Sequence, residues 1–159
     1  VGLFNLWIFY FIFTPLTTYS AFGILRVFDN SSKLFEGTLL FFSGEYAEII
    51  SACVAGAAYY LLLILNLTTP MKMKTRVKSI AFVLLGFLAL NIFRIVIFMM
   101  LYVKGYEYFS LAHELVWYFG STVLVVGIWF ANIYLFKIKG IPIYSDMRNL
   151  FRDVEKNKR

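Results

Sequence analysis

Three side chains stand out in this sequence because each is rare in its surroundings. Cys53 is the only cysteine and His113 the only histidine among the 159 residues. Arg94 is the only fully charged residue well inside a long apolar stretch, where a membrane helix tolerates arginine at a cost of about 2.5–3.5 kcal/mol. A thiolate can attack a carbonyl, an imidazole can move the proton, and a guanidinium can stabilise the negative charge that develops. The three residue types therefore suit covalent acyl transfer.

Two further residues are expected to support this chemistry. Asn91 precedes Arg94 by three residues, so both lie on one face of a helix. Gly56 is expected to share a helical face with Cys53, where small residues let a substrate backbone or a neighbouring helix approach the thiol. Ordinary helix packing explains the same small residues equally well. One cysteine and one histidine fall short of a ligand set, so we expect neither a metal nor another cofactor.

The composition points to a membrane environment. Hydrophobic residues make up 61% of the chain and charged residues only 15%, against about 45–50% and about 25% in soluble domains. Long unbroken apolar runs do not match the alternating pattern of a transmembrane barrel. These features exclude a soluble enzyme, a disordered chain and a disulfide scaffold, and they predict an all-α, polytopic transmembrane helical bundle.

Four windows are long and apolar enough to cross a bilayer as helices, since about 20 apolar residues span its hydrocarbon core. They cover approximately residues 3–24, 48–67, 79–103 and 113–136. The first window is too long and too aromatic for a signal peptide, and we interpret it as a true span. The whole chain, residues 1–159, is thus expected to form one membrane domain.

The distribution of basic residues predicts the orientation of these helices. Of the fifteen lysines and arginines, four lie in residues 68–78 and seven in the tail, residues 137–159. Because such residues accumulate on cytoplasmic loops, both termini and this basic tail are expected in the cytoplasm of a multi-pass cell-membrane protein. Residues 30–47 then lie outside, as an interfacial anchor or as a flap over a site. We attribute the net charge of +6 to the basic cytoplasmic segments, which can contact lipid headgroups, and we expect no nucleic-acid partner.

In this orientation the three reactive side chains reach a similar depth. At 1.5 Å per helical residue, Arg94 lies roughly 13 Å and Cys53 roughly 8 Å below the outer surface. The long arginine side chain can extend toward that surface, and His113 opens the fourth window. The sequence therefore predicts that the three residues occupy the outer third of the membrane on three different helices.

The order of these residues and their local sequences resemble the exosortase and archaeosortase family of membrane-embedded cysteine transpeptidases. The resemblance covers roughly residues 44–136 and rests on three short segments, which are Ser51–Gly56, Asn91–Ile95 and Ala112–Glu114. It implies that Cys53 is the nucleophile, that Arg94 is the activating or stabilising cation, and that His113 is the third catalytic residue. Family members often carry glycine two residues after the cysteine, whereas this chain has it three residues after.

The resemblance also implies a protein-sorting role with the active site facing outside. Such enzymes recognise a C-terminal signal on exported proteins, made of a short motif, a transmembrane helix and a basic tail. They cleave near the motif through a thioacyl intermediate and pass the new carboxyl end to a lipid or another acceptor. The expected partners are therefore membrane lipids, a possible lipid acceptor and exported proteins of this kind. An alternative is a non-enzymatic transporter or assembly subunit in which Arg94 and Asn91 bind an anionic group, so that Cys53 has no role.

Overall fold

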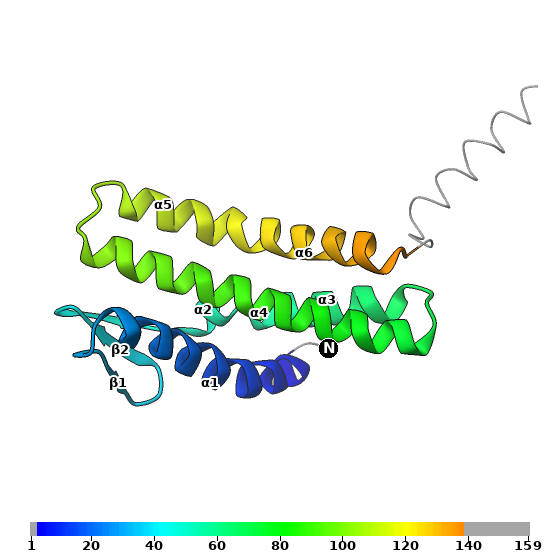
Figure 1. Ribbon diagram of the computed structural model, residues 1–159, viewed down its shortest axis with the longest axis horizontal. Helices are drawn as coiled ribbons and strands as arrows, with labels where there is room; N and C mark the ends of the chain where they lie inside the picture. Colours follow the sequence, from blue (N-terminus) through cyan, green and yellow to red (C-terminus); the bar gives the residue numbers. More distant parts are fainter. Residues whose placement is uncertain (1–2, 139–159) are drawn as a thin grey trace, which may run out of the picture.

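Four long helical segments run alongside one another in the computed structural model, which describes residues 3–138 (Figure 1). They are α1 (Leu3–Phe28), the pair α2 (Ser51–Val54) and α3 (Gly56–Thr68), α4 (Met73–Val103), and the continuous run of α5 (Phe109–Leu115), η1 (Val116–Gly120) and α6 (Ser121–Phe136). Each segment is long and apolar enough to cross a membrane. The predicted helical bundle is confirmed at this level.

The ends of the helices differ from the predicted windows. The first helix continues to Phe28, and the last begins at Phe109, four residues before His113. The third begins at Met73, so the basic residues within 74–78 lie on its first turns and not in a loop. A hydropathy window ends where the apolar residues end. Backbone hydrogen bonding continues through lysine and arginine, because both are good helix formers.

The second predicted window, residues 48–67, does not form one continuous helix. Ala55 separates α2 from α3 and has φ +56° and ψ +46°, in the left-handed region. This conformation costs a residue with a side chain about 1–2 kcal/mol, and it leaves the carbonyl groups at the end of α2 without their helical partners. The prediction that Cys53 and Gly56 share one helical face is therefore wrong.

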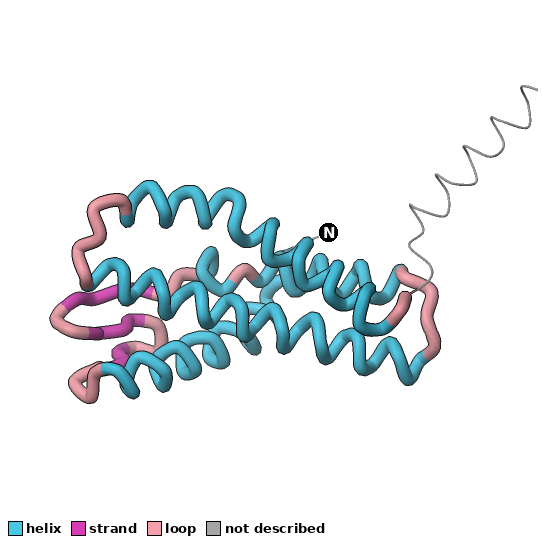
Figure 2. The backbone as a smooth tube through the Cα atoms, turned by 45° about the horizontal axis from the view of Figure 1, so that its top comes forward, coloured by secondary structure: helices cyan, strands magenta, loops and turns pink. Residues whose placement is uncertain are grey.

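Most of the predicted interfacial segment, residues 30–47, forms a small antiparallel sheet that was not predicted. Its strands are β1 (Lys33–Phe35), β2 (Leu39–Phe42) and β3 (Glu45–Glu48), in the order β1-β2-β3. Figure 2 shows the strands at the same end of the bundle as the loop that joins α4 to α5. The sheet faces the helices with its alternate residues Leu40 and Phe42, which are buried in the core.

Asp29 fastens this sheet to the end of α1. Its carboxylate accepts hydrogen bonds from the backbone N–H of Ser31 (2.9 Å) and that of Ser43 (3.0 Å), and also from both hydroxyl groups. Ser43 lies in the turn between β2 and β3. Because the Ser31 and then the Ser43 hydrogen bonds favour the charged carboxylate, they lower the pKa of Asp29 below its ordinary value.

We expect this attachment to be lost only in acid. A lowered pKa means that the contribution of Asp29 to stability is complete above the unfolded value of 3.8 and disappears as the pH falls through the folded value. The measurement is the NMR chemical shift of the Ser31 and Ser43 amide protons in micelles, followed from neutral pH to below 3.8. In Asp29→Asn the shifts should already be altered at neutral pH and should not titrate. A titration that persists in Asp29→Asn would show that another group is responsible.

Aromatic side chains connect three of the helices in the core. The ring of Tyr59 on α3 stacks on Phe13 of α1, with 3.8 Å between the ring centroids, and meets Phe87 of α4 edge to face at 4.9 Å. All three side chains are buried. These contacts hold α1, α3 and α4 together about one helical turn after the break at Ala55.

A buried chain of polar side chains connects the helices at the end away from the sheet. Asn66 of α3 donates its amide N–H to the hydroxyl of Ser79 on α4, and that hydroxyl donates to Asn132 Oδ1 on α6 at 2.8 Å. All three residues are fully buried. Polar side chains inside a membrane bundle find such partners across helices, so this chain fixes the relative register of α3, α4 and α6.

Candidate active site

A cavity of about 580 Å³ lies at the end of the bundle that carries the sheet. One wall is made by β3 and α2, and the opposite wall by α4 and α5. Cys53, Arg94 and His113 all line this cavity. The structure therefore brings together the three reactive residues that the sequence placed on different helices at one depth.

The break at Ala55 explains why Arg94 and Asn91 contact the cysteine segment. Asn91 Nδ2 donates to the carbonyl oxygen of Cys53 at 2.8 Å and to that of Val54 at 3.3 Å. Arg94 Nη2 donates to the same Cys53 carbonyl at 3.1 Å. In an unbroken helix these carbonyls would accept hydrogen bonds from amides one turn ahead. Here the two side chains of α4 replace those amides and support the left-handed residue.

The thiol of Cys53 is free and half-buried. The residue stands in the single turn of α2, where its own N–H donates to the carbonyl of Ile50 at 2.9 Å. Its backbone carbonyl is held from α4, and its side chain lines the cavity. The hydrogen bonds to α4 therefore involve the backbone of this residue and leave the sulfur available.

Arg94 brings a positive charge to the cavity. Within residues 3–138, no carboxylate lies within salt-bridge distance of its guanidinium, which makes the hydrogen bond to Cys53 and lines the cavity. An arginine has five N–H donors, so further donors remain for an oxygen atom inside the cavity. Such an arrangement stabilises a developing oxyanion more effectively than it would in water.

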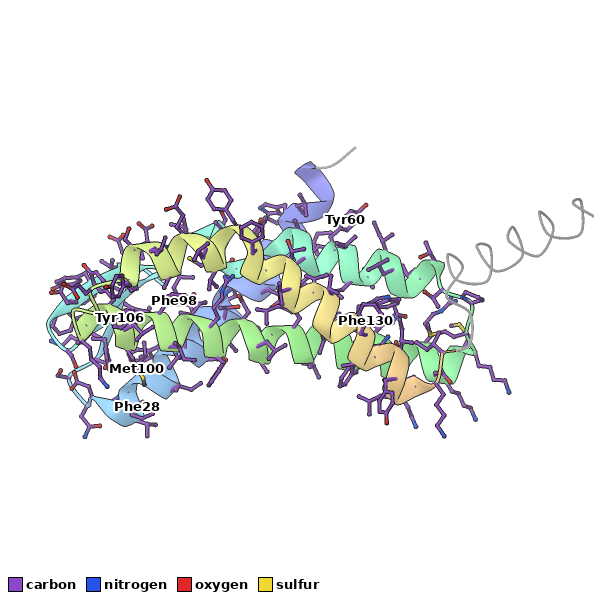
Figure 3. All side chains as sticks on the ribbon, turned by 90° about the horizontal axis from the view of Figure 1, so that it is seen from above. Phe28, Tyr60, Phe98, Met100, Tyr106 and Phe130 are labelled. Carbon is purple, nitrogen blue, oxygen red and sulfur yellow. The ribbon has the colours of Figure 1, made fainter. Side chains whose placement is uncertain are left out.

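Two aromatic rings hold the imidazole of His113. It stacks on Phe109 of the same helix, with 5.6 Å between centroids and 16° between planes, and it meets Phe98 of α4 edge to face at 5.4 Å. Figure 3 shows Phe98 between α4 and α5. In the described part of the chain, His113 and Cys53 line one cavity without a direct hydrogen bond. Catalytic contacts of this kind often tighten only when a substrate is bound.

Gly56 and Asn91, the two predicted supporting residues, lie behind the cysteine and do not line the cavity. A Cβ atom at Gly56 would come within 2.8 Å of the ring of Tyr10 on α1, so a side chain here would require that ring to shift. Asn91 is fully buried. Both residues determine the position of the cysteine segment, and neither is placed to contact a substrate.

One wall of the cavity is formed by a strand that was not predicted from the sequence. Residues 46–50, in β3 and directly after it, line the cavity. A signal was present, because Ser43-Gly44 directly after the apolar run of residues 39–42 is typical of a two-residue hairpin turn, and both residues have positive φ. The carboxylates of Glu48 and Glu114 also line the cavity. Across residues 3–138 no cluster of three or more potential metal ligands is formed.

Comparison with known proteins gives no match to this chain among family models, curated proteins or solved structures.

Proposed function

We propose that this protein is a membrane-embedded cysteine transpeptidase of the exosortase and archaeosortase type, which cleaves the C-terminal sorting signals of exported proteins. The observation that carries the proposal is the convergence of Cys53, Arg94 and His113 on one cavity. They are the only cysteine, the only histidine and a membrane-embedded arginine of this chain. Four helices are long and apolar enough to cross a membrane. Their presence supports the proposal that the substrate is itself anchored in the bilayer.

In the proposed reaction, His113 accepts and then donates a proton in each of the two halves. His113 accepts the thiol proton while Cys53 Sγ attacks the substrate carbonyl, and the negative oxygen that forms is stabilised by Arg94. His113 then donates the proton to the leaving amine, which leaves a thioester on Cys53. An amine, a hydroxyl group or water attacks the thioester, His113 takes its proton, and the returning proton restores the thiol.

The proposed orientation places the cavity at the outer membrane face. Basic residues within 74–78 lie at the end of α4 away from the cavity, beyond the buried chain that includes Ser79. Basic residues of membrane proteins concentrate on the cytoplasmic side. The sheet, the loop between α4 and α5, and the cavity then face outside, where exported proteins are processed.

The experiment that tests the function is the capture of a thioester on Cys53. Full-length protein is co-expressed with an exported protein of the same genome that ends in a short motif, an apolar helix and a basic tail. Intact-mass analysis should show an adduct equal to the part of the substrate before the cleaved bond, and hydroxylamine should release it. The chain has one cysteine, so the site of attachment is unambiguous. Cleavage that proceeds at the original rate after Cys53 has been alkylated would overturn the proposal.

The second candidate function is non-enzymatic binding of an anionic group. The positive charge of Arg94 favours it, because the guanidinium lines the cavity and forms no ion pair within the described residues. The amide N–H groups of Asn91 are already used by the carbonyls of Cys53 and Val54, so Arg94 would bind the anion without Asn91. In this case Arg94 variants lose function and Cys53→Ala keeps it.

A further inference from the structure

Strand β3 has one free edge. The sheet has the order β1-β2-β3, and within the described residues β3 pairs with β2 alone. A strand at the edge of a sheet presents a row of unpaired N–H and C=O groups that can pair with another chain. Proteins usually protect such an edge from pairing with other chains. The groups around the edge therefore indicate whether it can bind a peptide.

The register identifies the peptide groups at this edge. The N–H of Ile49 donates to the carbonyl of Thr38 on the β2 side at 2.9 Å, and antiparallel strands alternate between hydrogen-bonded and non-hydrogen-bonded pairs. Ala47 is therefore also paired toward β2, opposite Leu40. The N–H and C=O groups of Tyr46 and Glu48 point away from β2. No other group in residues 3–138 makes a backbone hydrogen bond to them.

This edge faces the cavity that contains the thiol. Residues 46–50 line the cavity together with Cys53, and Phe98 and Phe109 line its other wall. Only one turn separates the strand from the nucleophile, because the N–H of Cys53 donates to the carbonyl of Ile50. A segment that runs along the edge therefore comes directly to the sulfur.

We propose that an extended peptide segment of the substrate pairs with the free edge of β3 as a fourth strand and so presents its carbonyl group to Cys53. This inference rests on the proposed function and names how the peptide is held. Pairing with an edge strand supplies affinity through main-chain hydrogen bonds, while the alternate side chains provide specificity. The peptide groups of Tyr46 and Glu48 are the binding groups on the protein.

The test compares alkylation of Cys53 by peptide and by simple electrophiles. The probes are methyl vinyl sulfone and a panel of tetrapeptide vinyl sulfones with different side chains. In each, the sulfur adds to the vinyl carbon β to the sulfone, and the thiol proton ends on the carbon α to the sulfone, so no group leaves. Full-length protein in lipid nanodiscs is used, and the rate is followed by intact mass. Peptide probes should react at least about tenfold faster across the panel, the effect of one or two hydrogen bonds. N-methylation of the peptide amides should remove this advantage.

Two variants at one position separate the backbone from the side chain. Glu48→Pro removes the outward N–H and keeps the hydrogen bonds to β2, because proline is tolerated where an edge N–H faces away from the sheet. Glu48→Ala removes the carboxylate and keeps the N–H. In Glu48→Pro the ratio of the peptide rate to the methyl vinyl sulfone rate should fall to about one, and this ratio corrects for any change in the reactivity of the thiol itself. Glu48→Ala should retain the advantage.

The outcomes distinguish this proposal from the proposed function. If methyl vinyl sulfone does not modify Cys53, the nucleophile is absent and both proposals fail. If it modifies Cys53 and the peptide probes gain nothing, only the pairing with β3 is overturned. Should Glu48→Pro fail to fold, the N-methylated peptides on the original protein decide, and an unchanged rate for them overturns the pairing. A dimer that dissociates in Glu48→Pro without any change in peptide labelling would show that a second copy occupies the edge.

Discussion

Cys53→Ala is expected to abolish the release of C-terminal sorting signals and to leave the fold of the protein intact. The substitution removes the sulfur that would carry the acyl group. It retains the backbone carbonyl that accepts hydrogen bonds from Asn91 and Arg94. Because the hydrogen bonds from α4 reach only the backbone of residue 53, alanine at this position should preserve the break at Ala55 and the cavity around it. Removal of a nucleophile lowers turnover by more than about a thousandfold in enzymes that use a covalent intermediate.

The measurement is the release of a C-terminal tag from a co-expressed exported protein that carries a motif, an apolar helix and a basic tail. Thermal unfolding in detergent reports the fold. Ser51→Ala is a matched control, since Ser51 lies in the same turn of helix, is exposed and makes no side-chain hydrogen bond within residues 3–138. It should process the substrate at the original rate. Undiminished release by Cys53→Ala would exclude the thioester mechanism and favour binding of an anionic group.

Arg94→Met is expected to lower processing far more than it lowers stability. Methionine fills much of the space of the arginine stem, and Asn91 continues to donate to the Cys53 carbonyl at 2.8 Å. The fold loses one hydrogen bond, worth about 1 kcal/mol or a shift in Tm of roughly 2–4 °C. The oxyanion loses its cationic donor, which costs about 100- to 1000-fold in turnover at comparable sites.

Arg94→Lys separates charge from geometry at the same position. A lysine supplies a positive charge without the planar fork of the guanidinium. If the fork must bind the Cys53 carbonyl and an oxyanion together, Arg94→Lys should restore part of the Tm that Arg94→Met loses. It should restore only a small share of the turnover that Arg94→Met loses. Equal turnover for Arg94→Lys and the original protein would show that charge alone suffices. Full turnover in Arg94→Met would reduce Arg94 to a role in supporting the helix break.

The membrane class and the number of long helices were predictable because hydropathy is a local property that adds up along the chain. The rarity of the single cysteine, the single histidine and the embedded Arg94 was equally visible. The rise of a helix per residue also let their depths be compared. Rotation of each helix about its own axis is not encoded in that comparison, since it depends on packing between segments far apart in the sequence. Only the structure could show Cys53, Arg94 and His113 on one cavity.

The break at Ala55 lay beyond prediction for a related reason. A left-handed position normally carries glycine, and here glycine stands one residue later, where it packs against the ring of Tyr10 of α1. The alanine tolerates φ +56° because Asn91 and Arg94, nearly forty residues away, donate hydrogen bonds to the carbonyl of Cys53 in place of the helical amides. The sequence by itself determined four long apolar helices, and it predicted that Cys53, Arg94 and His113 lie at one depth. Tertiary contacts decided that α4 supports the cysteine segment from behind, and that a free strand edge approaches it from the front.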